Sequence, residues 1–214
     1  MVKCERTFPA PPSLAKRKSY NDSDTIQQLK EIFNGKCYIC ELQNLQDGIP
    51  EHLIPHKENE DLKFDWENLF WACNRCNSVK NNKKYEGKII DCCKVDPELH
   101  LIFIYEPYSA QITVKAKDSL EMSIMTATLI DESFNLENTG LRISSLSERM
   151  RSFKEEWNKF IKILNEYKSK NTKLNFNKVK ARLNRKTAFA AFKRNYIRNH
   201  SSEYKDFQQF VAVN

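Results

Sequence analysis

Two pairs of closely spaced cysteines constrain this chain more than any other feature of its sequence. Cys37 and Cys40 form one pair, Cys73 and Cys76 form a second with the same spacing, and 32 residues separate the two pairs. Two residues between cysteines let both thiolates reach one ion, and four thiolates close a tetrahedral zinc site with no open position. The spacing therefore predicts a structural Zn²⁺ that joins two distant segments of the chain.

The number of cysteines and the character of the first residues argue against disulfide bonds. The chain has seven cysteines, an odd number, and its first residues lack the apolar stretch of a secretory signal. We expect Cys92 and Cys93 to pack in the core, since no paired spacing makes them a second metal site. No apolar run approaches the ~20 residues that span a membrane, so we expect a cytoplasmic protein without membrane contact.

Pattern and composition divide the chain into three regions. Residues 1–24 read as an extended basic arm, because Pro9, Pro11 and Pro12 oppose helix formation. Residues 25–118 contain the paired cysteines, with a short helix expected at 25–33 and strands at 101–105 and 111–115. Residues 119–214 are expected to be a helical C-terminal region that carries a basic tract.

The helical region is predicted from the spacing of its apolar residues. From about residue 144 they recur at steps of three or four, which is typical of one buried helix face. This stripe consists of Leu146, Met150, Phe153, Trp157, Phe160, Ile161, Leu164 and Tyr167. A second helix is expected at about 176–198, with Val179, Leu183, Phe192 and Tyr196 facing inward.

The positive charge is concentrated in one part of that region. Residues 168–200 contain eleven Lys or Arg and no Asp or Glu, which leaves 24 basic against 28 acidic residues elsewhere. Lys178, Arg182 and Arg185 would share one face of a continuous helix, and a phosphate-rich partner is the simplest explanation. An acidic partner protein or a solvated helix face are the alternatives.

The segment between and beside the cysteine pairs resembles a known nuclease family. It reads Pro50-Glu51-His52-Leu53-Ile54-Pro55-His56, then Asn68-Leu69 before the second pair, then Cys76-Asn77-Ser78-Val79-Lys80. Over about residues 36–82 this order is similar to HNH nucleases built around a zinc clip. The resemblance implies an α+β fold, in which a small zinc-clipped beta-beta-alpha metal module is embedded in a mostly helical chain.

The resemblance also implies roles for individual residues. His52 would activate water, a task that suits an imidazole whose ordinary pKa is about 6.5. Glu51 and Asn77 offer oxygen atoms to Mg²⁺ or Mn²⁺, although the family commonly has His where this chain has Asn77. Asn68 would support His52 through the intervening loop. For Lys80, a phosphate contact and a solvated helix face remain equally open.

Further motifs are similar to the HNH subunit of Septu-type (PtuB-like) anti-phage systems. They are the segments at residues 9–14, 33–41, 91–103 and 189–196. This narrower resemblance implies an ABC/SMC-like ATPase partner (PtuA-like) and a role in defence against phage.

These observations lead to one functional expectation and its rivals. We expect a metal-dependent HNH endonuclease that hydrolyses phosphodiester bonds as the effector subunit of a defence complex. DNA is favoured as its substrate, and structured RNA is an alternative. The rival from another class is a zinc-stabilised nucleic-acid-binding or assembly module without catalysis, which would need the cysteines but not Glu51, His52 and Asn77 together.

Overall fold

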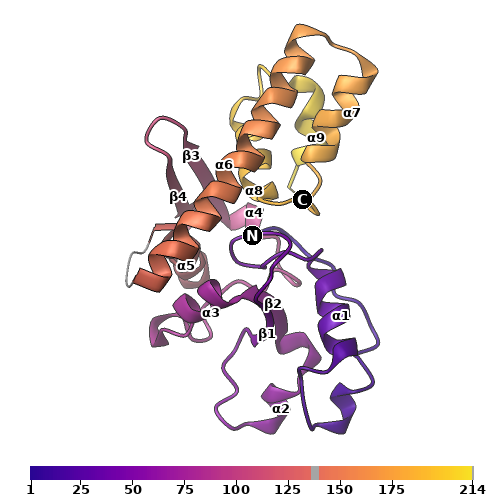
Figure 1. The fold of residues 1–214 in the computed structure, drawn as a ribbon, viewed down its shortest axis with the longest axis vertical. Helices are drawn as coiled ribbons and strands as arrows, with labels where there is room; N and C mark the ends of the chain where they lie inside the picture. Colours follow the sequence, from indigo (N-terminus) through magenta and orange to yellow (C-terminus); the bar gives the residue numbers. More distant parts are fainter. Residues whose placement is uncertain (136–139, 214) are drawn as a thin grey trace.

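The fold combines many helices with two small antiparallel sheets (Figure 1). The computed structural model describes the backbone of residues 1–135 and 140–213, and the side chains of residues 1–135 and 148–213. The α-helices of the first half are α1 (Ser23–Ile32), α2 (Glu60–Lys63), α3 (Asn74–Lys80) and α4 (Pro97–His100). Those of the second half are α5 (Glu121–Asn135), α6 (Gly140–Ser169), α7 (Lys173–Arg182), α8 (Ala190–Asn199) and α9 (Gln208–Val211). This confirms the predicted mixture of helix and sheet.

Two hairpins form the sheets. In the first, β1 (Gly48–His52) pairs with β2 (Leu69–Cys73), and His52 lies opposite Leu69. In the second, β3 (Leu101–Glu106) pairs with β4 (Gln111–Ala116), which confirms both predicted strands. Alternate residues of β3 are buried, as expected of a strand with one face on the core. The helix α3 directly follows β2 and packs on the first hairpin.

The first residues are extended, as predicted, but they are packed against the rest of the chain. Met1, Val2, Cys4 and Leu14 are all buried. The backbone N–H of Cys4 donates a hydrogen bond to the carbonyl of Cys92, at 2.9 Å. The apolar side chains explain this arrangement, because burying them removes apolar surface from water. Residues 1–24 are therefore part of the folded body and do not project from it.

The long predicted helix is confirmed as α6. Phe153, Trp157, Phe160 and Leu164 are buried along one face, as their spacing indicates. The side chain of Leu146, which the same pattern included, lies outside the described residues. In Figure 1, α6 runs diagonally from α5, which packs on β4, towards α7, so it links that part of the fold with the C-terminal helices.

The prediction of a single second helix at 176–198 is wrong. The chain forms α7 and α8 instead, with a non-helical link between them. Phe189, directly before α8, has a left-handed backbone conformation with φ of 49°, so right-handed helical geometry cannot run through it into α8. The ammonium group of Lys36 donates hydrogen bonds to the carbonyls of Arg185 and Thr187, so a tertiary contact holds the link.

Within the described residues, none of the helices has both the length and the apolar character needed to cross a bilayer.

Candidate functional site

The four paired cysteines converge, as predicted. Their sulfur atoms all lie within 4.8 Å of one another, and all four side chains are buried. Zinc–sulfur bonds of about 2.3 Å in a tetrahedron place sulfur atoms about 3.8 Å apart. The 4.0 Å between the sulfur atoms of Cys40 and Cys73 fits that geometry. The cluster can therefore bind one metal ion such as zinc.

Backbone pairing brings the two cysteine pairs together. The N–H of Tyr38 donates to the carbonyl of Trp71 at 2.9 Å, which fixes the first pair beside β2. Cys73 ends β2, and Cys76 lies in the first turn of α3. The metal cluster thus sits at the junction of β2 and α3, where an ion would fix the helix against the hairpin.

Glu41, which sequence reasoning missed, anchors the first cysteine pair to the C-terminal helices. Its buried carboxylate pairs with the amino groups of Lys36 and Met1, and it accepts hydrogen bonds from the N–H groups of Ala190 and Ala191. Burial alone would raise its pKa, but Lys36 and the Met1 ammonium lower the pKa to about 2. The carboxylate also suits the positive N-terminal end of α8.

A cavity of about 380 Å³ collects three of the residues predicted to be catalytic. Its lining includes Glu51 and His52 from β1, Asn77 from α3, and also Tyr20 and His56. Outside the cysteine cluster, no group of three or more His, Cys, Asp or Glu side chains converges within the described residues. The cavity is thus a candidate site in which the imidazoles of His52 and His56 lie among a few polar groups.

A hydrogen bond fixes which ring nitrogen of His52 carries the proton. Its Nε2 lies 3.0 Å from the carbonyl oxygen of Lys63, and because a carbonyl accepts, Nε2 must donate. Nδ1 is then the basic nitrogen of the neutral ring. The rings of Tyr20 and His56 pack edge-on against it, with centroids 4.7 and 4.8 Å away. Burial, more than neighbouring cations, lowers the pKa of His52 and favours the neutral base.

Asn68 secures the loop that carries the carbonyl bonded to His52. Its side-chain oxygen accepts from the N–H of Ile54, at 2.8 Å, and its amide donates to the carbonyls of Ile54 and Leu62, at 2.9 and 3.0 Å. Leu62 precedes Lys63 in the chain, so these bonds place the Lys63 carbonyl. Asn68 itself is buried, and it acts on His52 through the loop.

Neither role left open for Lys80, a phosphate contact or a solvated helix face, fits the structure. The side chain of Lys80 is buried, and its ammonium group lies 3.1 Å from the Glu51 carboxylate and 2.7 Å from the carbonyl oxygen of His52. Burial raises the pKa of Glu51, while Lys80 and the Tyr38 hydroxyl oppose that change. Lys80 therefore belongs to the interior support of β1, where it is not exposed to a nucleic acid.

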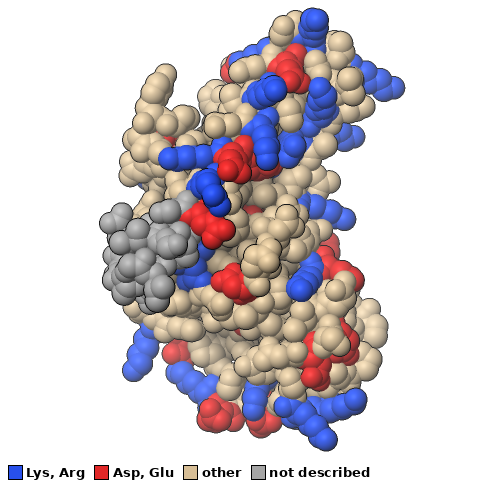
Figure 2. All heavy atoms as spheres, in the orientation of Figure 1, with Lys and Arg blue, Asp and Glu red and all other residues tan. Residues whose placement is uncertain are grey.

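The structure does not contain the continuous basic helix face that the sequence predicted. Because α7 ends at Arg182, Arg185 lies outside the helix and does not share a helix face with Lys178 and Arg182. Each of the three cations is paired within the chain. Lys178 pairs with Glu166, Arg182 with Glu156, and Arg185 with Asp96 and Glu98. Figure 2 likewise shows acidic side chains among the basic ones in the upper part of the molecule.

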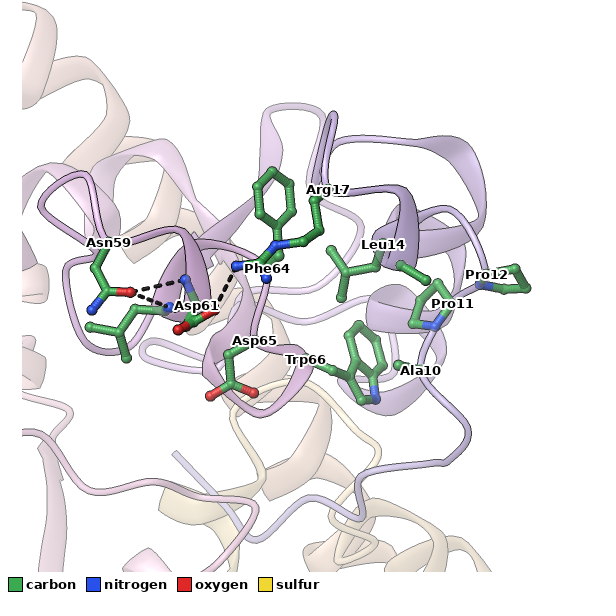
Figure 3. A pocket seen from close by; sticks show the side chains of 12 residues that line it. Ala10, Pro11, Pro12, Leu14, Arg17, Asn59, Asp61, Phe64, Asp65 and Trp66 are labelled. Carbon is green, nitrogen blue, oxygen red and sulfur yellow. Dashed lines mark hydrogen bonds and ion pairs between the residues drawn. The ribbon is translucent and has the colours of Figure 1, made fainter.

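A larger cavity, of about 700 Å³, lies between residues 10–17 and residues 59–66 (Figure 3). Leu14, Phe64 and Trp66 give it apolar walls, and an ion pair of 2.7 Å joins Arg17 to Asp61. Its lining contains no histidine or cysteine. We therefore assign the candidate chemistry to the smaller cavity.

Comparison of the chain with protein-family models, with curated proteins and with solved structures finds no match.

Proposed function

We propose that this protein is a metal-dependent HNH-type nuclease that hydrolyses phosphodiester bonds, with His52 as the general base. The observation that carries the proposal is the cavity in which a neutral His52, with Nε2 already donating to the Lys63 carbonyl, lies beside Glu51 and Asn77. Nδ1 of His52 would take a proton from the water that attacks phosphorus, and the hydroxide formed would displace the leaving oxygen.

The proposal includes a divalent ion, Mg²⁺ or Mn²⁺, at the same cavity. Glu51 and Asn77 both line it, and Oε1 of Glu51 is buried without a hydrogen bond of normal geometry to any described residue. Carboxylate and amide oxygens are suitable donors for such ions, which commonly complete their coordination with water and substrate phosphate. The bound ion would neutralise charge that develops on the phosphate. Lys80 would help to keep Glu51 ionised.

The four-cysteine cluster has a separate role in the proposal. A closed tetrathiolate site leaves no open position, so its Zn²⁺ would be structural and would fix α3 against the hairpin that carries His52. On the resemblance noted above, the nuclease would act with an ABC/SMC-like ATPase in anti-phage defence.

A cleavage assay tests the activity directly. Purified protein, with and without a candidate ATPase partner, is incubated with plasmid DNA and with total RNA in Mg²⁺ or Mn²⁺. We expect His52→Ala to lower the cleavage rate by about 10²- to 10⁴-fold, because the base is lost, while the metal content and the folded state are retained. His100→Ala is the matched control, since His100 pairs with Asp118 outside this cavity. Equal rates for wild type and His52→Ala would refute the assignment.

The pairing of Glu51 with Lys80 supports a second candidate, a nucleic-acid-binding module without catalysis. In that case Lys80 already neutralises the carboxylate, and the pair simply stabilises β1 against α3. Binding of DNA or RNA without cleavage, under every metal and partner condition above, would favour this candidate.

A further inference from the structure

A buried arginine from α6 reaches the four-cysteine cluster. Arg149 is 1% exposed, and its Nη2 donates a hydrogen bond to the sulfur of Cys73, at 3.2 Å. Its Nη1 donates to the carbonyl oxygen of Ser133, in the last turn of α5, at 2.6 Å. The guanidinium also lies over the ring of Phe134. One side chain thus joins α5, α6 and a metal-binding cysteine.

The charge of Arg149 has no carboxylate partner within the described residues. Burying a cation is costly unless an anion or several hydrogen bonds compensate it. The thiolates of the cluster supply that anion, because a divalent ion bound by four thiolates carries a net charge of −2. The carbonyl end of α5 adds a weaker negative potential. Metal binding keeps all four ligands as thiolates, so a bound ion sustains the negative charge that faces the guanidinium.

We propose that Arg149 is the counter-ion of the metal tetrathiolate, and that it makes the docking of α6 depend on the bound metal. Because linkage between two equilibria is reciprocal, the docked helix also tightens the hold on the metal. The inference rests on the metal assignment within the proposed function and is independent of hydrolysis. It extends the role of the cluster from the β2–α3 junction to the long helix of the second half.

Metal affinity tests this role with three variants. Arg149→Met removes the charge at similar length, Arg149→Lys keeps it, and Arg151→Met alters an exposed arginine two residues further along α6. We expect Arg149→Met to raise the dissociation constant for Zn²⁺ by about 10- to 100-fold, as loss of a residue that supports metal ligands does. Arg149→Lys should recover part of the affinity, and Arg151→Met should match wild type in competition with a chromophoric chelator.

Cobalt substitution gives a readout that general destabilisation would not produce. With Co²⁺ in the cluster, the thiolate-to-cobalt absorption bands should shift in Arg149→Met, because Cys73 loses a charged hydrogen-bond donor. Arg151→Met should leave the bands unchanged. An Arg149→Met variant that folds and keeps wild-type affinity and bands would overturn the role of Arg149.

Hydrogen exchange on the wild-type protein covers the case in which Arg149→Met does not fold. On removal of the metal, we expect residues 148–164 and the last turns of α5 to lose protection. Metal-free protein that keeps α6 as protected as the metal-bound protein would overturn the proposal. A purified chain that binds no metal would overturn both the metal assignment and this inference, whereas unchanged affinity in a zinc-bound variant refutes the inference alone.

Discussion

His52 owes its chemical state to its surroundings. The Lys63 carbonyl selects the tautomer, and burial favours the neutral ring. A hydrogen bond to a carbonyl alone would raise the pKa of His52, but burial outweighs it, with smaller contributions from His56 and Lys80. The residue is therefore available as a base at a pH where an exposed histidine is partly protonated.

If His52 is the base of the proposed nuclease, its surroundings predict the pH dependence of cleavage. The base is active when neutral, so activity falls as the pH drops through its pKa. Because that pKa is lowered from 6.5, the acid limb of kcat/KM should lie below pH 6.5. Rates measured between about pH 5 and 8, with metal held constant, would locate the limb. A limb at or above pH 6.5 would contradict the environment that we describe for His52.

A second prediction at this scale concerns Glu41. Its pKa is lowered from 4.5 to about 2, so its stabilisation is fully present above pH 4.5 and is lost as the pH falls towards 2. The shift corresponds to about 3 kcal/mol of unfolding free energy. Glu41→Gln should lose stability of this order at pH 7, and its stability should vary less between pH 4.5 and 2.

Urea unfolding of the wild type and of Glu41→Gln at several pH values measures both effects. Glu148→Gln is a suitable control, because that side chain is exposed on α6. If Glu41→Gln were as stable as the wild type at pH 7, the buried carboxylate would not anchor the cysteine segment to α8.

Among the structural elements, the loop between β1 and β2 carries the most specific prediction. Asn68→Asp keeps the acceptor for the N–H of Ile54 but removes both donors, which leaves the carbonyls of Ile54 and Leu62 without this partner. An unsatisfied buried group costs about 1–3 kcal/mol. We expect lower thermal stability and slower cleavage, because the Lys63 carbonyl would no longer be fixed for His52.

Asn158→Asp, on the exposed side of α6, provides the control for the effect of an added charge on stability and amide exchange. Exchange of backbone amides in residues 53–65 should increase in Asn68→Asp and stay constant in the control. Unchanged exchange in that loop would mean that Asn68 does not secure it.

Prediction from sequence succeeded for elements with a clear local period. The alternation in β3 and β4 and the apolar steps along α6 are properties of each segment alone. The break between α7 and α8 has no comparable signal, because residues 183–189 contain neither Gly nor Pro. Lys36, almost 150 residues away, bonds to the carbonyls of that link. Such a tertiary contact is invisible to a local pattern.

In the candidate site, too, features with a local sequence pattern were predictable, and features that depend on distant segments were not. Cysteine spacing indicated the metal cluster, because the geometry of each pair is local. The edge-on packing of Tyr20 against His52 was not indicated, since Tyr20 comes from a distant segment. The burial of Lys80 did have a signal. Lys80 follows Cys76 by four residues, so the two share a helix face, and a metal-binding cysteine must face the interior.

For the whole molecule, the net charge is +7, and cations such as Lys178, Arg182 and Arg185 are already paired with carboxylates. The location of cations without such a partner therefore decides where a polyanion would bind. A groove of about 840 Å³ lies between α6 and α7. It is lined by Lys162, Lys170 and Lys178, together with three asparagines and Glu166. Lys178 pairs with Glu166, whereas Lys162 and Lys170 form no ion pair within the described residues. These two lysines are the better candidates for phosphate contacts.

We therefore predict that Lys162→Ala with Lys170→Ala weakens binding to DNA or RNA and leaves the metal cluster and the His52 cavity intact. Each phosphate contact releases condensed counterions, so the slope of log affinity against log salt should decrease by about 1 for each lysine lost. Filter binding at several salt concentrations measures that slope. Lys115→Ala, an exposed lysine on β4, is the control. An unchanged slope in the double variant would mean that nucleic acid does not bind in this groove. Loss of co-purification with the ATPase in the same variant would identify the groove as a protein interface.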